Sequence, residues 1–577
     1  MNSFWNKCGF RENATVLALF FAAVHLFYSK TMNAGFVTDF TGLQERLEGA
    51  PFLGFLHCFG FPALHQVTNF FLFIFYKIFG TEPWPWYLVY TSLHVANGFL
   101  GYIVAKKVFE KSGIAVPPPA PPDESGGGIA VPALIAASLF LLSPYNAEAV
   151  IWKVCFNFLF CTFTMLSSLL FFIKYMEGNK RKDFVFSILF FVAALFTFEL
   201  ALALPLIVLV FMFYWREGGS GVGRPPRRRT PGVVAGVRRL EGRPTPWIAV
   251  PFFILSAIYF LMNKIILGGW VGHYGEGVHL NFSIKPIAAN YLKYFSKYLV
   301  FWREWPHLIK EQLIKTCDTG FIAYIFLFIG IAIIIAGIVF YKKINNKIKA
   351  VGFLWLLFFL ALAPVSNLYV AWILHGENDR YGYFASLFFY MGMVALFQYF
   401  NKKIRYVFYA ALLGISIFNL IKINNYWSES EKVVHGLLND FRWENNSEIY
   451  VLAFPENYKG IPMFKDFSRK DLSLKGALKY MADKKPKGRF YQVAQFNMFD
   501  KNNGLTATVD SGKLIKLSFH EWGSWWWRNG IGTGAYEREQ YDFKPVPKGC
   551  EIKIKKAAED AVFIFSDGDK WREIAPQ

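Results

Sequence analysis

The sequence predicts an α-helical polytopic membrane protein of about eleven transmembrane helices, followed by a C-terminal extramembrane domain of α+β type, rich in β-strands. Three observations predict this fold class. Of the 577 residues, 54% are hydrophobic and only 18% are charged, whereas soluble proteins have about 25% charged residues. Apolar runs approaching the length of a bilayer-spanning helix, about 20 residues, recur along the chain. After Ile423 these runs stop.

The transmembrane domain is expected over residues 1–423, with one apolar run for each span. Several runs are shorter than about 20 residues, which is common for helices that are packed inside a bundle. The first run has a charged start and no small-residue cleavage site after it, so it is expected to remain as a helix. The expected spans are residues 13–31, 85–105, 129–143, 154–174, 183–198, 200–215, 246–266, 320–341, 350–372, 382–400 and 404–421.

Basic residues between the spans predict the orientation. Every basic cluster follows an even-numbered span, and Lys and Arg beside spans gather on the cytoplasmic side. The register therefore predicts a cytoplasmic N-terminus and an extracytoplasmic C-terminal domain. Because the basic residues flank apolar runs, the net charge of +20 indicates anionic lipid headgroups as partners and argues against nucleic acid. The clusters are Lys106, Lys107 and Lys111; Lys174, Lys180, Arg181 and Lys182; residues 216–243; Lys342, Lys343, Lys347 and Lys349; and Lys402, Lys403 and Arg405.

Three connecting segments stand out from the spans. Residues 31–84 form an outer loop, in which the aromatic stretch 52–79 is broken by Gly and Pro and is expected to form interfacial helices on the outer leaflet. Residues 112–128 are rich in Pro and Gly, which is typical of a flexible cytoplasmic linker. Residues 216–246 carry Arg in place of the usual Lys, and they are interpreted as a second cytoplasmic tether, with a lipid-headgroup patch as the alternative.

Residues 424–577 are expected to fold as the extracytoplasmic domain. Residues 426–441 have the pattern of a short amphipathic helix, and alternating segments then predict strands at 448–453, 489–493, 514–519, 550–554 and 561–565. Trp522 and Trp525 to Trp527 form an aromatic cluster. A domain core or an interfacial belt is one interpretation of this cluster, and a surface that stacks against sugars is the other.

The register also gathers polar residues on the outer side. Because charged groups are costly at mid-membrane, at least about 2.5 kcal/mol each, they persist mainly at interfaces and in cavities. A convergent polar site on the outer face follows as a hypothesis. Its candidate members, from five separate loops, are Asp39, Glu148, Glu199, His273, Glu276, His375, Glu377, Asp379 and Arg380.

Five short motifs occur in order on this outer side: FVTD at 36–39, SPYNAEAV at 143–150, FELALALP at 198–205, APVSNL at 363–368 and DRYGY at 379–383. Together they resemble the outer-loop motifs of the GT-C glycosyltransferases, which include the protein O-mannosyltransferases and their relatives with TPR repeats. The resemblance covers roughly residues 10–430. The chain departs from the family pattern at four positions, where Phe40, Ser143, Phe198 and Asp379 replace a second acid, a His, a Lys and a Glu.

The resemblance implies inverting transfer of a sugar from a polyprenyl-phosphate donor to an extracytoplasmic hydroxyl of a protein or glycan. In that role Asp39 is the base and Arg380 binds the donor phosphate, with His375 and His273 as weaker candidates for the same anion. Glu148 and Glu199 would hold sugar hydroxyls or orient Arg380, and Tyr381 belongs to the same donor-binding set. A structural alternative stays open for each principal residue: a helix cap for Asp39, and an ion pair with Glu377 or Asp379 for Arg380.

Three functions therefore agree with the sequence. The expected location is the cell envelope, in a bacterial inner membrane. The leading one is a GT-C-type glycosyltransferase. The second is a catalytically inactive subunit of the same fold that scaffolds a larger membrane complex, since the four replacements fit a loss of activity. The third is a transporter of lipid-linked glycans, which ranks last because no internal repeat is visible. The sequence identifies no cofactor and leaves only a divalent cation open.

Overall fold

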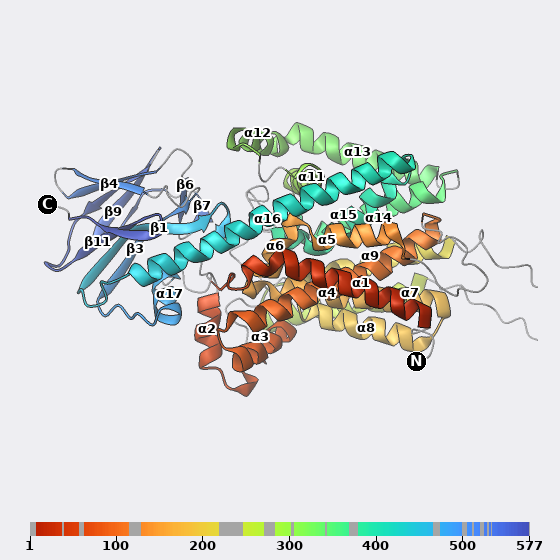
Figure 1. Ribbon diagram of the computed structural model, residues 1–577, viewed down its shortest axis with the longest axis horizontal. Coiled ribbons are helices and arrows are strands. Elements are labelled where there is room, and N and C mark those ends of the chain that lie inside the picture. Colours follow the sequence, from red (N-terminus) through yellow and green to blue (C-terminus); the bar gives the residue numbers. More distant parts are fainter. Residues whose placement is uncertain are drawn as a thin grey trace, which may run out of the picture.

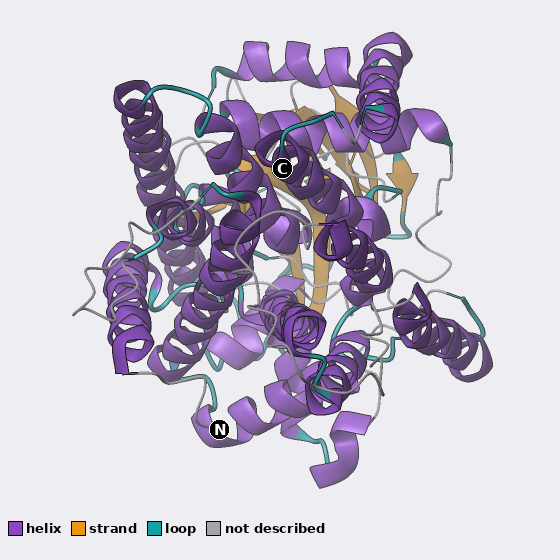
Figure 2. Cartoon of the chain, turned by 90° about the vertical axis from the view of Figure 1, so that its right-hand side faces the viewer, coloured by secondary structure: helices purple, strands orange, loops and turns teal. Residues whose placement is uncertain are grey.

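The computed structural model consists of an elongated helical bundle joined to a smaller module of β-sheets (Figure 1). The end view from the side opposite the sheets shows the bundle helices nearly along their axes, with the strands behind them (Figure 2). The structure describes residues 7–36, 40–56, 63–114, 129–217, 246–270, 283–301, 305–340, 343–367, 379–464, 473–498, 505–510, 513–519, 524–527, 530–531, 534–547 and 549–575.

Each predicted span overlaps a helix of the bundle, although the span 350–372 extends past the end of α14. The helices are α1 (Lys7–Tyr28), α4 (Pro83–Ser112), α5 (Val131–Leu141), α7 (Phe156–Gly178), α8 (Arg181–Leu195), α9 (Leu204–Glu217), α10 (Val250–Leu267), α13 (Gly320–Val339), α14 (Asn346–Leu362), α15 (Tyr383–Phe397) and α16 (Lys402–Asp440). Within the described ranges, seven helices are long and apolar enough to cross a membrane, or up to eight if a bent pair counts as one span.

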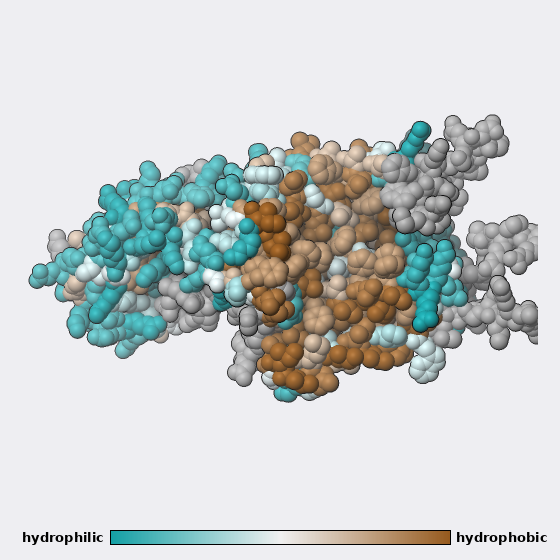
Figure 3. All heavy atoms as spheres, turned by 90° about the horizontal axis from the view of Figure 1, so that it is seen from below, coloured by the Kyte–Doolittle hydropathy of each residue, from teal (hydrophilic) through white to brown (hydrophobic). Residues whose placement is uncertain are grey.

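The surface of the bundle is apolar around its middle. Large hydrophobic side chains face outward there, among them Phe328, Leu189 and Ile258 near the middle of α13, α8 and α10, which are 71%, 56% and 47% exposed. Figure 3 shows this as a brown belt between the hydrophilic sheet module and a hydrophilic patch at the far end of the bundle. Apolar surface of this extent is unusual for a protein in water.

Basic residues that the sequence assigned to one side of the bundle lie at one end of it, away from the sheets. At the end of α4, Lys106 Nζ donates to Glu12 Oε1 of α1 at 2.7 Å, and Lys107 Nζ donates to Glu177 Oε2 of α7 at 2.7 Å. The next basic residue, Lys111, donates to the carbonyl of Trp215 at the end of α9 at 2.9 Å. The start of α1 and the ends of α4, α7 and α9 therefore meet, as an alternating register of spans requires.

Shorter elements cover the opposite end of the bundle. The outer loop forms α2 (Phe40–Glu48), η2 (Phe52–Leu56) and α3 (Gln66–Phe79), so the described part of the aromatic stretch is helical except at residues 63–65. Two further helices, α11 (Ile284–Val300) and α12 (His307–Asp318), have no predicted counterpart. Most of both tethers lies outside the described residues, which omit 115–128 and 218–245.

The boundary expected near residue 423 is not a break in the chain's helix. The amphipathic segment 426–441 is continuous with the last bundle helix, and α16 runs without interruption from Lys402 to Asp440. The prediction of a separate short helix is therefore wrong. Backbone hydrogen bonds continue through a helix regardless of side-chain polarity, so the change from apolar to amphipathic composition marks only where α16 leaves the apolar belt.

The C-terminal module contains two sheets. The larger has seven strands in the order β12-β11-β1-β3-β6-β7, with β2 paired to β1, and β1 runs parallel to both β3 and β11. The smaller has the order β4-β5-β10-β9-β8. The strands are β1 (Glu448–Tyr458), β2 (Ile461–Pro462), β3 (Arg489–Met498), β4 (Leu505–Asp510), β5 (Leu514–Phe519), β6 (Ser524–Trp527), β7 (Gly530–Ile531), β8 (Tyr536–Glu537), β9 (Tyr541–Val546), β10 (Gly549–Ile554), β11 (Val562–Asp567) and β12 (Lys570–Glu573).

This module confirms the predicted C-terminal sheet region, and the predicted strand segments all lie on strands. Its core includes apolar side chains from the last turns of α16, such as Val434 and Leu438. A helix between the strands, α17 (Ser473–Met481), lies against α2 of the outer loop. Of the tryptophan cluster, Trp522 lies outside the described residues, whereas Trp525 to Trp527 belong to strand β6.

Candidate functional site

The predicted site residues fall into two groups. Asp39, His273 and His375, together with Glu276 and Glu377, lie outside the described residues. Glu148, Glu199, Arg380 and Tyr381 are described, and all four lie in short elements between the long helices. These elements are α6 (Ala147–Ile151), η5 (Glu199–Ala203) and η10 (Asp379–Gly382).

Four of the five motifs lie in neighbouring turns at the bundle end that faces the sheets. The SPYNAEAV segment forms η3 (Pro144–Asn146) and α6 after a 51° bend from α5. The DRYGY segment forms η10, which lies against both η3 and α6. The FELALALP segment forms η5, and it lies against η9 (Ala363–Val365) of the APVSNL segment. Motifs far apart in sequence are therefore adjacent in the fold.

Arg380 is held by Glu148 through two hydrogen bonds. Its Nη1 donates to Glu148 Oε1 at 2.5 Å, and its backbone N–H donates to Glu148 Oε2 at 2.8 Å. The Glu148 side chain is 3% exposed and that of Arg380 is 13% exposed. The guanidinium carbon lies 4.8 Å from the centre of the Trp152 ring and 4.9 Å from that of Tyr381. The side chain is thus fixed in direction by a carboxylate and two aromatic rings.

The adjacent residue, Asp379, is bound by a lysine that the sequence analysis did not single out. Lys297 Nζ of α11 donates to Asp379 Oδ1, and both side chains are buried. The Lys297 ammonium also lies 4.9 Å from the centre of the Tyr145 ring in η3. Asp379 was expected as one of two partners for Arg380, and its described ion pair is with Lys297 instead. Asn290, Lys293 and Lys297 recur at helical spacing, and this pattern could have indicated a polar face on α11.

Glu199 contacts the outer loop. Its Oε2 lies 2.8 Å from Nε2 of His65, and the two side chains are 12% and 11% exposed. Backbone contacts hold the same segments together, since Val67 N–H donates to the carbonyl of Phe196 at 3.1 Å. Glu199 therefore ties η5 to the start of α3. His65 carried no signal in the sequence, because a single histidine in an aromatic stretch has no distinctive spacing.

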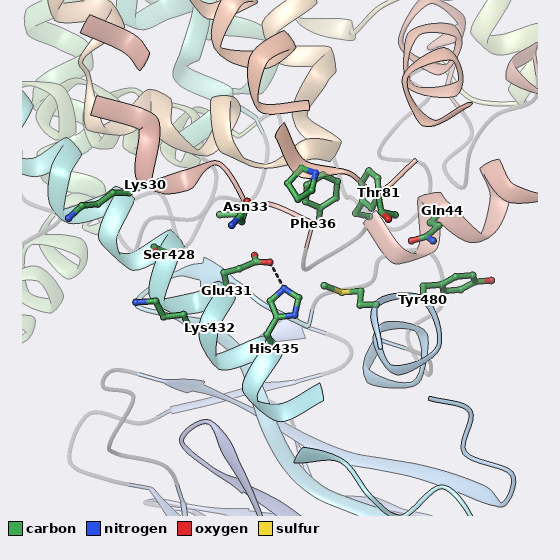
Figure 4. A pocket seen from close by; sticks show the side chains of 14 residues that line it. Lys30, Asn33, Phe36, Gln44, Thr81, Ser428, Glu431, Lys432, His435 and Tyr480 are labelled. Carbon is green, nitrogen blue, oxygen red and sulfur yellow. Dashed lines mark hydrogen bonds and ion pairs between the residues drawn. The ribbon is translucent and has the colours of Figure 1, made fainter. Parts of the chain in front are cut away.

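A cavity of about 550 Å³ lies between this end of the bundle and the C-terminal module. Lys30, Asn33, Phe36 and Gln44 contribute from the bundle side, and further residues contribute from α16 and α17 (Figure 4). Phe36 and Phe40, the nearest described neighbours of Asp39 along the chain, both line the cavity. The residues on α16 and α17 are Ser428, Glu431, Lys432, His435, Tyr480 and Met481.

One short segment connects the cavity wall to the Arg380 pair. Trp152 stacks on Arg380, and the next residue, Lys153, donates its backbone N–H to the carbonyl of Gly35 at 3.1 Å. The Lys153 side chain is buried, and its ammonium lies 5.8 Å from the centre of the Phe36 ring and 5.3 Å from that of Tyr90. Within the described ranges, Lys153 has no carboxylate at ion-pair distance, so the aromatic faces are its nearest compensating groups.

No protein-family model matches the chain, and the search of curated proteins found no match. Within the part of the chain that the structure describes, no three or more His, Cys, Asp or Glu side chains gather closely enough to hold a metal ion.

Proposed function

We propose that the chain is an integral-membrane glycosyltransferase of GT-C type, which moves a sugar from a polyprenyl-phosphate donor to an extracytoplasmic protein or glycan acceptor with inversion. One observation carries the proposal: the four described motif segments contact one another in two pairs at one end of the bundle, η3 and α6 with η10 and η5 with η9, and the first pair holds the Glu148–Arg380 ion pair. The family resemblance predicts convergence of these segments, and packing of apolar spans alone does not require it.

The membrane topology belongs to this proposal. About eleven spans, a cytoplasmic N-terminus and an extracytoplasmic C-terminal module are supported by the apolar belt and by the meeting of basic clusters at the end away from the sheets. The turns that carry Glu148, Glu199 and Arg380 would then lie at the outer leaflet. A lipid-linked donor is anchored in that leaflet, so its phosphate would reach the turns without leaving the membrane surface.

The proposed reaction is a single displacement. The oxygen of an acceptor hydroxyl forms a bond to the anomeric carbon while the bond from that carbon to the phosphate oxygen breaks, and polyprenyl phosphate leaves. Asp39 accepts the hydroxyl proton, a role that typically contributes about 10² to 10⁴ in rate. Arg380 binds the phosphate as negative charge grows on it, and the Glu148 carboxylate fixes the direction of the guanidinium beforehand.

The proposal is tested in cells that lack the protein. Loss of a sugar from surface proteins or glycans, detected by mass spectrometry, should be restored by the natural chain. Asp39→Asn keeps the shape of the side chain but removes the base, so transfer should fall by about two orders of magnitude or more while the protein still folds. Asp183→Asn, at the start of α8, is the matched control and should restore transfer fully. Full transfer by Asp39→Asn would overturn the base assignment.

The scaffold subunit remains the second candidate, because one observation favours it. Arg380 and Asp379 are both engaged in ion pairs, partly buried for Arg380 and fully buried for Asp379, and such pairs also occur as purely structural elements. In that case, cells lacking the protein would keep intact glycans and lose an assembly of membrane proteins, which blue-native electrophoresis would detect. A transporter of lipid-linked glycans ranks third, since the described ion pairs of the motif segments lie in end turns and not at mid-span.

A further inference from the structure

The cavity between the bundle and the C-terminal module has a mixed lining. Asn33 and Gln44 bring amide groups from the bundle side, and Ser428 brings a hydroxyl from α16. Phe36 and Tyr480 are aromatic residues of the lining (Figure 4). Small-molecule sites typically combine apolar walls with a few polar groups in about 300–1,000 Å³, and this cavity of about 550 Å³ lies within that range.

Among the described residues that line the cavity, Glu431 is the one carboxylate, and its hydrogen bonding is incomplete. The residue is 8% exposed, and its Oε1 accepts from His435 Nε2 at 2.9 Å. Its Oε2 is buried and has no hydrogen-bond partner within the described part of the chain. A carboxylate can accept about four hydrogen bonds, and leaving a buried acceptor unpaired is unfavourable.

Basic side chains lie around Glu431. Lys153 lies within electrostatic reach of it on the bundle side, and Lys30 and Lys432 also line the cavity. A carboxylate with unused acceptor capacity calls for a donor, and the terminal torsion of a Glu side chain turns easily between orientations. A hydroxyl group entering the cavity would supply that donor.

From these contacts we infer that the cavity is a saccharide-binding site, in which Glu431 accepts a hydrogen bond from a sugar hydroxyl. Amides and the Ser428 hydroxyl bind further hydroxyls, and the ring of Phe36 faces the C–H surface of the sugar. Lys30 and His435 accompany the described carboxylate of Glu431, whereas Lys432 is paired with Glu429, so a sugar that carries its own carboxylate binds more tightly than its neutral counterpart. The inference deepens the proposed function, on which it rests for the identification of this sugar as an acceptor.

Binding is measured on the full-length protein in nanodiscs prepared without sugar-based detergents. Saturation-transfer NMR is recorded with methyl glycosides of glucose, galactose, mannose, N-acetylglucosamine and glucuronic acid. At least one should receive saturation, and the glucuronide should receive more than the matched glucoside. Saturation of none of the five would overturn the inference, and so would inorganic phosphate as the sole molecule that binds.

The role of Glu431 is tested with a neighbour on the same helix. Glu431→Gln should reduce saturation of the bound glycoside at least fivefold, whereas Glu429→Gln, whose carboxylate binds Lys432 on the surface at 2.8 Å, should leave it unchanged. Asn33→Ala on the opposite wall should also reduce saturation, and it keeps the test valid if Glu431→Gln does not fold. Unchanged binding in both cavity variants contradicts the assignment.

The two proposals fail separately. If the natural chain binds glycosides and transfers no sugar, the saccharide site stands and the glycosyltransferase proposal falls. If it transfers sugar and binds no glycoside, the glycosyltransferase proposal stands and the saccharide site falls.

Discussion

Glu148 and Arg380 are 232 positions apart in sequence, yet one carboxylate accepts from both the guanidinium and the backbone N–H of Arg380. Glu148 therefore fixes the side chain and the start of η10 together. The two contacts have different consequences, because the guanidinium contact pairs charges and the backbone contact only needs an acceptor. Variants that remove the charge of the side chain and keep its shape distinguish the guanidinium contact from the backbone contact.

Neutralising either member of this pair should destabilise the protein. Glu148→Gln or Arg380→Gln leaves one buried charge unpaired, which costs about 3–5 kcal/mol in unfolding free energy, and the double variant should lose less than the sum. Thermal unfolding in detergent measures all three. The matched pair Lys107 and Glu177, whose side chains are 25% and 41% exposed, should couple by less than about 1 kcal/mol. Strictly additive losses at Glu148 and Arg380 would show that the ion pair does not stabilise the fold.

Membrane orientation is checked by reporter fusions. A reporter fused at Lys402 and one fused at Gln577 should lie on opposite sides of the membrane, because α16 is the last predicted span between them. A fusion at Lys111 should agree with the one at Lys402. If the reporters at Lys402 and Gln577 lay on the same side of the membrane, the register of spans would be wrong. The placement of Arg380 on the outer side depends on that register.

Gly35 should not tolerate a side chain. Its φ is +97°, and a Cβ would overlap the carbonyl oxygen of Ile151. Gly35→Ala should therefore lower the unfolding free energy by about 1–3 kcal/mol from backbone strain alone and should separate residues 35–36 from the segment that carries Lys153. Gly49→Ala, where a Cβ meets nothing within 4 Å, is the control and should change stability by less than about 0.5 kcal/mol. Equal unfolding temperatures for the two variants would refute this account.

His435 should make stability depend on pH. It lies on α16 beyond the predicted span 404–421, and its hydrogen bond to Glu431 raises its pKa above the ordinary 6.5. The contribution of protonated His435 to the free energy of unfolding is thus complete below pH 6.5. It is lost as the pH rises through the raised pKa of His435. Since the side chain is 48% exposed, the contribution is at most about 1 kcal/mol.

Thermal unfolding of the natural chain and of His435→Gln should therefore differ more at pH 5.5 than at pH 9. If the difference in unfolding temperature between the two proteins instead grew with pH, protonated His435 would be excluded as the stabilising partner. In the part of the chain that the structure describes, the other charged or titratable groups around this pair are Lys432 on the same helix, Lys30 in η1 (Ser29–Thr31), Lys153 in η4 (Lys153–Cys155) and Tyr480 in α17.

The sequence predicted the long helices well, because an apolar run is a local property. It did not predict α11, in which Lys293 and Lys297 interrupt the hydrophobic pattern although both side chains are buried. Their burial depends on a distant partner, as Asp379 shows for Lys297. The continuity of α16 was missed for a related reason, since a change in composition at Ile423 resembles a domain boundary.

The candidate site was only partly predictable. The register placed Glu148, Glu199 and Arg380 on one side, and the fold brings Glu148 to Arg380 but gives Glu199 to His65. Which carboxylate meets which cation depends on packing between elements far apart in sequence. Lys153 and Glu431 were not singled out at all, because neither belongs to a motif and their proximity arises only where α16 passes the end of the bundle.

The uninterrupted course of α16 has a mechanical consequence. Asn401 caps its start by accepting the backbone N–H of Ile404 at 2.9 Å, and Glu431 lies about 44 Å further along the helix axis at 1.5 Å per residue. A rigid rod of that length acts as a lever: a tilt of about 5° at the basic end displaces the Glu431 backbone by about 4 Å. Helix rearrangement deep in the bundle would thereby open or close the cavity wall, with no hinge needed between the two parts of the molecule.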